Sequence, residues 1–284
     1  MGIKTDYKHT FLASYGGYIT QAVVNNFLPL LFLIFQDTFG IPLEQITLLV
    51  TINFFVQLII DLASAKFVDR IGYRKCLVWA HILACVGIAG LSILPFIMPP
   101  FIGLLICVVV YAVGGGLDEV LISPLVESCP SDNKAGAMGL LHSFYCWGCV
   151  GTILLSTLFL YGFGKDSWRI LALLWAIVPA LIAVYFSQVP IPPIYEEGEK
   201  GMGLLELCKS KVFWVMAVLI LCAGGSEQAM SQWASAFAES GLGVPKTIGD
   251  LMGPCFFAVL MGLSRVFYAK ISAKVDILKY MTFC

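Results

Sequence analysis

Charged side chains are scarce in this chain of 284 residues. They make up 12% of it, against about a quarter in soluble domains, while 59% of the residues are hydrophobic. Seventeen basic and eighteen acidic residues give a net charge of −1, which offers no electrostatic attraction for nucleic acid. This composition excludes an ordinary soluble domain and predicts an all-α integral membrane protein.

Signatures of catalysis and of cofactor binding are also missing. The sequence holds no G-x-S-x-G elbow, no phosphate-binding P-loop and no H-E-x-x-H zinc motif. Cys146 and Cys149 have the spacing of a redox pair, but they lie inside an apolar run, where small residues suit helix packing. We therefore expect no enzyme, no cofactor and no metal site.

Long apolar runs occupy most of the chain. A helix needs about 20 apolar residues to cross a bilayer. Eight runs reach that length, at residues 11–35, 46–67, 76–98, 101–126, 138–161, 168–188, 212–237 and 248–271, and a ninth begins at Ile277. The first run is too long for a signal peptide and lacks a small-residue cleavage site, so we expect it to be retained.

A short basic turn at residues 65–75 joins the second and third runs and orients the chain. Cytoplasmic connections of membrane proteins are enriched in Lys and Arg. If the N-terminus is cytoplasmic, thirteen basic residues lie on the cytoplasmic side and three outside, while Arg265 falls within the eighth run. We therefore expect a multi-pass protein of the plasma (cytoplasmic) membrane with its N-terminus in the cytoplasm.

The same turn resembles the signature of the major facilitator superfamily between its second and third helices, roughly G-x-L-A-D-R-x-G-R-K. Four positions agree and two differ: the matches are Asp69, Arg70, Gly72 and Arg74, and the departures are Ala65 and Tyr73. The resemblance implies that the four matching residues form a cytoplasmic gate motif. The alternative is a basic loop that only obeys the charge rule.

By this resemblance, a full-length member has twelve helices in two halves, with the solute site between the halves near the middle of the membrane. We expect a six-helix bundle at 1–188, a cytoplasmic linker at 189–211 and a partial second bundle at 212–284, so that the chain is truncated at its C-terminal end. A weak internal repeat supports two halves, because Gly40-Ile41-Pro42 returns as Gly243-Val244-Pro245 and Gln21-Ala22 as Gln228-Ala229.

Ionisable groups inside the apolar runs are costly, so each is a functional candidate. They are Asp61, His81, Asp118, Glu119, His142, Glu227 and Arg265. Asp61 and His81 lie at similar distances from the basic turn, so they could pair across the hairpin; a structural pair is the first interpretation and a proton relay the alternative. Glu119 with His142 is the first candidate for a proton-coupling site, with Asp118 and Glu227 as further candidates. A structural ion pair is the alternative.

Amide side chains interrupt the first and seventh runs at corresponding places. In the superfamily these two helices line the central cavity, so the resemblance implies solute contacts from Gln21, Asn25, Asn26, Glu227, Gln228, Gln232 and Trp233. Amides with one aromatic face suit a neutral solute rich in hydroxyl groups. The stretch from Gly225 to Trp233 and residues 140–145 also resemble the fucose-permease branch of sugar:proton symporters.

Together these features predict a monomeric secondary active transporter that works by alternating access. Its expected partners are a small, polar, sugar-like solute, a proton or other coupling ion, and the lipid bilayer. Two alternatives stay open, namely an exporter of drugs or amphipathic compounds of the same superfamily and a truncated membrane protein that transports nothing. Amides argue against the first, and the missing last helices support the second.

Overall fold

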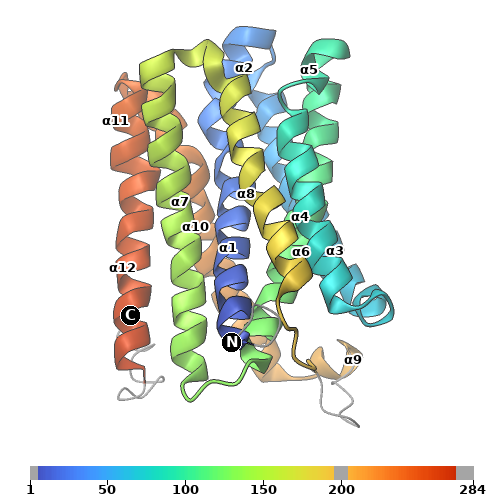
Figure 1. The fold of residues 1–284 in the computed structure, drawn as a ribbon. Coiled ribbons are helices and arrows are strands. Elements are labelled where there is room, and N and C mark those ends of the chain that lie inside the picture. The colour runs from blue at the N-terminus through green and yellow to red at the C-terminus, as the bar shows by residue number, and fades with distance from the viewer. Residues whose placement is uncertain (1–5, 195–203, 273–284) are drawn as a thin grey trace.

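The computed structural model describes residues 6–194 and 204–272, and all regular structure in these residues is helical (Figure 1). The longer helices are α1 (Tyr7–Asn26), α3 (Leu43–Ile71), α4 (Tyr73–Gly90), α6 (Pro100–Ser128), α7 (Lys134–Phe163), α8 (Trp168–Gln188), α10 (Lys211–Leu242) and α12 (Phe256–Ile271). The shorter ones are η1 (Leu28–Leu31), α2 (Phe32–Phe39), α5 (Leu94–Ile97), η2 (Lys165–Ser167), α9 (Leu204–Leu207), α11 (Lys246–Asp250) and the π-helical turn η3 (Leu251–Cys255).

Seven helical stretches in the described residues are long and apolar enough to cross a membrane. This result confirms a multi-pass helical architecture, but the count differs from the eight predicted. The run at 76–98 is divided, because α4 ends at Gly90 and a turn at residues 91–93 precedes α5. Figure 1 shows α4 and α5 following one another from one end of the bundle to the other. The predicted start of a ninth helix at Ile277 lies outside the described residues.

Two other predicted runs bend within their length. The first breaks after α1, where Pro29 cannot donate a backbone hydrogen bond and the chain forms the 3-10 turn η1 before α2. The last breaks at Gly253 and Pro254, where Gly253 has φ −89° and ψ −105° inside η3. Breaks of this kind separate α11 from α12 and let the two parts follow different directions.

The Gly-x-Pro repeat has the same local structure at both sites. Gly40 ends α2 with φ 64°, and Gly243 ends α10 with φ 65°. Pro42 and Pro245 then cap α3 and α11 with nearly equal backbone angles. Glycine is favoured in this left-handed conformation because it lacks a Cβ atom. The shared geometry supports the internal repeat.

Helix α1 lies at the centre of the bundle, against α6, α7 and α8 (Figure 1). Helices α4 and α6 approach each other closely through glycine. A Cβ atom on Gly87 would lie 2.6 Å from the backbone nitrogen of Tyr111, and one on Gly114 would lie 2.8 Å from that of Ala84. Small residues at a crossing allow this close packing in membranes, so α4 packs against α6 and α8 more than against α3.

The connections predicted to be cytoplasmic gather at one end of the bundle. Figure 1 shows the α3–α4 turn, the α6–α7 loop and α9 at the end where α1 begins and α12 ends, with α5 and α11 at the other. The alternation of helix directions therefore agrees with the predicted layout. Which end faces the cytoplasm stays a prediction.

Candidate functional site

A cavity of about 280 Å³ lies among six helices: α1, α3, α6, α7, α10 and α12. All of its lining residues except Phe54 carry a polar or ionisable group, and they are Tyr18, Gln21, Asn25, Phe54, Glu119, His142, Tyr145, Glu227, Gln228 and Arg265. Six of the predicted site residues meet here: Gln21, Asn25, Glu119, His142, Glu227 and Gln228. The structure thus brings them together from distant parts of the sequence, while their roles stay predictions.

Buried amides fix one wall of the cavity. Gln57 donates from Nε2 to Asn25 Oδ1 at 2.9 Å and to Asn53 Oδ1 at 3.1 Å. Asn53 Nδ2 donates to the same Asn25 oxygen at 3.3 Å, and Gln21 Nε2 donates to Gln57 Oε1 at 3.2 Å. The sequence prediction missed Asn53 and Gln57. Their spacing of four residues inside an apolar run was the available signal.

Glu119 has an amide partner and no cation partner among the described residues. Gln21 Nε2 donates to Glu119 Oε2 at 3.4 Å. The carbonyl oxygen of Gln21 is buried and accepts no hydrogen bond from the described residues. This oxygen and the Glu119 carboxyl group therefore have capacity left for a hydroxyl-bearing ligand or for a proton.

Arg265 and Glu227 form an ion pair in the cavity, with Nη2 and Oε2 3.4 Å apart. Both side chains keep some exposure, 31% and 24%. Arg265 also donates from Nη1 to the backbone oxygen of His142 at 3.4 Å. The pair joins α10 to α12, and it neutralises the second cavity carboxylate.

His142 of α7 lines the cavity next to α1. Its ring packs edge-to-face against Tyr18, with centroids 5.2 Å apart, and Tyr18 shares a hydrogen bond of 2.6 Å with Ser123. No hydrogen bond or ion pair between His142 and Glu119 is found in the described structure. Glu119 and His142 therefore line the same cavity in this structure but are not directly hydrogen-bonded to each other.

Three predicted solute contacts do not line this cavity. Asn26 donates to Ala22 O at 2.9 Å and to Cys149 Sγ at 3.1 Å, which makes it a helix-packing residue. Gln232 is buried and donates to the backbone oxygen of Asn25 at 2.9 Å. Trp233 packs against Phe32, with ring centroids 5.6 Å apart, and lines a separate apolar groove.

The predicted pairing of Asp61 with His81 is wrong. His81 Nδ1 lies 3.1 Å from Asp118 Oδ1, and both side chains are fully buried. The cause is the glycine-mediated packing of α4 on α6, which turns His81 toward Asp118. Asp118 thus faces α4 while its neighbour Glu119 lines the cavity.

The predicted gate motif lies at the α3–α4 turn. Gly72 has φ 95° and connects the two helices, in a backbone conformation that favours glycine because it lacks a Cβ atom. Arg74 donates from Nη1 to the backbone oxygens of Phe186 and Ser187, at 3.1 Å each, and so satisfies the C-terminal end of α8. Arg70 is exposed. The Asp69 side chain lies outside the described part of the structure.

A buried acid that the sequence prediction missed joins α7 to α10 and α11. Asp250 accepts hydrogen bonds from Thr157 at 2.9 Å, from Lys246 at 3.2 Å and from Ser235. Nearby, Lys165 Nζ lies 3.9 Å from Glu239 Oε1. The i, i+4 spacing of Lys246 and Asp250 was the available signal. These contacts lie at the end of the bundle opposite to the basic turn.

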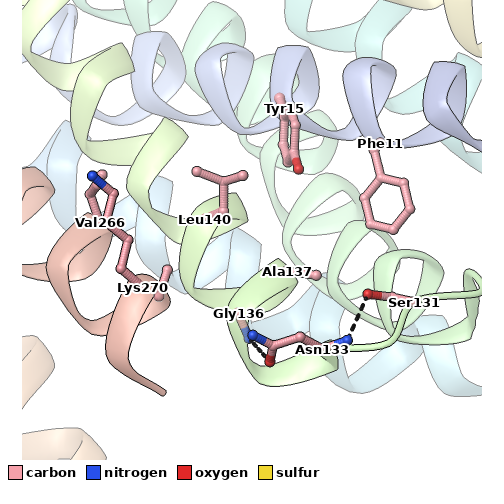
Figure 2. Close-up of a pocket in the computed structure, with 10 residues that line it drawn as sticks. Phe11, Tyr15, Ser131, Asn133, Gly136, Ala137, Leu140, Val266 and Lys270 are labelled. Atoms are coloured by element: carbon pink, nitrogen blue, oxygen red, sulfur yellow. Dashed lines mark hydrogen bonds between the residues drawn. The ribbon is translucent and has the colours of Figure 1, made fainter. Parts of the chain in front are cut away.

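A second hollow, of about 490 Å³, lies near the α6–α7 loop (Figure 2). Figure 2 shows Phe11 and Tyr15 of α1, Leu140 of α7, and Val266 and Lys270 of α12 around it. On α1 and α12 its lining positions adjoin those of the polar cavity, since Tyr15 precedes Tyr18 by about one turn and Val266 follows Arg265.

Residues 10–284 match the Major Facilitator Superfamily. The chain therefore belongs to this superfamily, as the basic turn had indicated. No curated protein sequence matches it significantly.

Solved transporters share the fold at low sequence identity. A D-xylose–proton symporter matches with a TM-score of 0.68 and 15% identity, over 93% of this chain and 68% of that one. The proton:xylose symporter XylE bound to 6-bromo-6-deoxy-D-glucose matches with a TM-score of 0.59 and 13% identity, over 98% of this chain and 56% of that one. A bacterial homologue of the human lysosomal transporter Spinster, in an inward-facing and unoccupied conformation, matches with a TM-score of 0.66 and 16% identity, over 97% of this chain and 65% of that one. The chain thus spans about 56 to 68% of their lengths.

Proposed function

We propose that this chain carries a small, uncharged polar solute of the sugar class across a membrane together with a proton. The observation that supports this proposal is the polar cavity between α1, α3, α6 and α7 on one side and α10 and α12 on the other. These two sets of helices belong to the proposed bundles 1–188 and 212–284, joined by a linker at 189–211. Alternating access needs a site of this kind between two bundles.

The balance of charge in the cavity favours a neutral solute. Arg265 offsets Glu227, which leaves Glu119 as the uncompensated acid. When Glu119 takes up a proton, the lining has no net charge, with His142 neutral. Glu119 is therefore the proposed coupling site, and Glu227 and His142 set the charge around it. A neutral solute then adds no charge to the low-dielectric membrane interior.

Hydrogen-bonding capacity favours a solute rich in hydroxyl groups. The cavity offers amides from Gln21, Asn25 and Gln228, and hydroxyl groups from Tyr18 and Tyr145. Its volume is close to the lower end of the ~300–1,000 Å³ typical of small-molecule sites. The fold shared with a xylose symporter and the resemblance of residues 140–145 to the fucose-permease branch suggest the same class.

The second hollow is the proposed route between the cavity and the cytoplasm. It lies at the end that holds the basic turn, next to the cavity along α1 and α12. In this proposal the protein is a monomer of the plasma membrane with a cytoplasmic N-terminus, and the α3–α4 turn forms part of the cytoplasmic gate.

The test is uptake of labelled neutral monosaccharides, beginning with D-xylose, into proteoliposomes that hold the purified chain. We expect an inward proton gradient to drive accumulation and a protonophore to abolish it. Glu119→Gln should lose accumulation while it retains solute exchange, because exchange needs no change in protonation. Glu127→Gln, an exposed position on the same face of α6, is the matched control. Monosaccharide uptake that does not depend on the proton gradient would contradict the proposed proton coupling.

A second candidate is export of amphipathic compounds. The observation that favours it is the apolar groove of about 550 Å³ beside Trp233, between α10 and α11. The same proteoliposomes, loaded with a lipophilic fluorescent dye, distinguish the two functions. Gradient-driven loss of the dye without monosaccharide uptake would replace the first proposal. Failure to move either kind of compound would favour a membrane protein that transports nothing.

A further inference from the structure

A histidine and an aspartate meet inside the α4–α6 interface, away from the cavity lining. His81 Nδ1 lies 3.1 Å from Asp118 Oδ1, and neither side chain has any exposure. The same Nδ1 lies 2.8 Å from the backbone oxygen of Leu77. A carbonyl oxygen only accepts, so Nδ1 carries a hydrogen that points mainly to Leu77.

The other polar atoms of the His81–Asp118 pair are buried without hydrogen bonds from the described residues. Both carboxyl oxygens of Asp118 and the Nε2 atom of His81 have no hydrogen-bond partner within the described structure. Burial of a polar group without a partner is costly, and burial of an isolated charge is far more so. An ionised Asp118 beside a neutral His81 would place a full negative charge in this position.

One additional proton removes that charge. On an Asp118 oxygen it gives a neutral acid beside a neutral imidazole, and on His81 Nε2 it gives an imidazolium beside a carboxylate. In both cases the pair is neutral as a whole. We propose that His81 and Asp118 together bind a proton in the α4–α6 interface, at a site separate from the cavity carboxylates.

The described residues around the pair supply no other compensating charge. On α1, Gly17 adjoins His81 Nε2, and the titratable neighbour is Tyr18, the next residue along the chain. On α8 the neighbour is the uncharged Phe186 ring, 5.1 Å from the His81 ring between centroids. On α3, which packs against α6, the ionisable residue in this region is Asp61.

The place of this site suggests what it does. Asp118 is the residue before Glu119 on α6, so a movement of α6 that changes the surroundings of one acid changes those of the other. The pair is then a second proton site in the transport cycle, and this role rests on the proposed proton coupling. Proton binding itself does not rest on it and is measurable without any solute.

Infrared spectroscopy of the purified full chain in lipid nanodiscs tests the binding of the proton. Aspartate labelled with ¹³C distinguishes aspartic acid from glutamic acid, and exchange into D₂O shifts the band of a protonated carboxyl group. We expect one such band to vanish in Asp118→Asn and to remain in Asp61→Asn. Asp61 lies in the same membrane region as Asp118 and is the matched control.

Nitrogen NMR of the wild type covers the case in which the proton resides on histidine. Carbon NMR of the ¹³C-labelled aspartate, with Asp118 identified by its proximity to the His81 ring nitrogen, covers the case in which Asp118→Asn does not fold. The chain has three histidines, so His9→Gln and His142→Gln assign His81 without a change in the pair. A protonated Asp118 or a doubly protonated His81 between about pH 5 and 8 supports the proposal. A neutral His81 beside an ionised Asp118 over that range overturns it, whether or not the protein transports a monosaccharide.

Discussion

Arg265 and Glu227 compensate each other at the edge of the cavity, which makes their effects interdependent. We expect Arg265→Gln to slow monosaccharide uptake about tenfold, because it leaves Glu227 as a second uncompensated acid. The double variant Arg265→Gln, Glu227→Gln should recover part of that rate, since the charge is again balanced. Each single change should cost about 1 kcal/mol of stability, as for other partly exposed pairs. Initial uptake rates and thermal unfolding of the three variants check this. A double variant slower than Arg265→Gln would contradict it.

Some of the residues that line the cavity were predictable from the sequence, and others were not. Gln21, Asn25 and Glu119 were predictable, because a polar side chain in an apolar run is costly and needs a purpose. Asp118 and Glu119 are adjacent, and only the rotation of α6 decides which one faces the cavity. Trp233 likewise turns to an apolar groove, since one helical step changes the direction of a side chain by about 100°.

The amide cluster between α1 and α3 gives a prediction at the level of elements. Gln57→Leu removes the donor that Asn25 and Asn53 share and the acceptor of Gln21. Buried groups left without partners cost about 1–3 kcal/mol, so the variant should unfold at a lower denaturant concentration. Thr51→Val, at an exposed position of the same helix, is the control and should change stability little. Equal stability of the two variants would show that the cluster does not hold α1 against α3.

Glycine packing gives a second prediction for the helix pair α4 and α6. Gly114→Ala should destabilise the protein by about 1–3 kcal/mol, because the new methyl group meets the α4 backbone at Ala80 and Ala84. Gly151→Ala in α7 is the matched control, since a Cβ atom there meets nothing within 4 Å. The control should be neutral or slightly stabilising. Denaturant titration monitored by tryptophan fluorescence separates the two, and a harmless Gly114→Ala would contradict the close approach.

Helix existence was easier to predict than helix continuity. Hydropathy locates apolar runs, yet it does not reveal the breaks near Pro29, at residues 91–93 and at Gly253. Nor did the spacing from the basic turn identify the partner of His81. That spacing assumed that α3 and α4 pack along their length, whereas α4 packs mainly on α6 and α8.

At the scale of the whole molecule, the proposed bundles are joined at the end opposite to the basic turn. Asp250 links α10 and α11 to Thr157 of α7, and Lys165 lies near Glu239 of α10. If the solute must pass this end, Lys165→Cys with Glu239→Cys should stop uptake when the two thiols are oxidised to a disulfide, by at least fivefold. Reduction should restore the rate, and Lys165→Cys alone is the control. Full uptake by the oxidised protein would place the pathway elsewhere.

Coupling between solute and proton is the central claim, and solute-dependent proton entry tests it most directly. Proteoliposomes that contain a pH-sensitive dye should acidify inside when the monosaccharide taken up fastest is added outside. No proton gradient is imposed at the start of this experiment. Glu127→Gln should behave as wild type, and Glu119→Gln should not acidify. Entry of the monosaccharide with no change in internal pH would contradict the proposed mechanism.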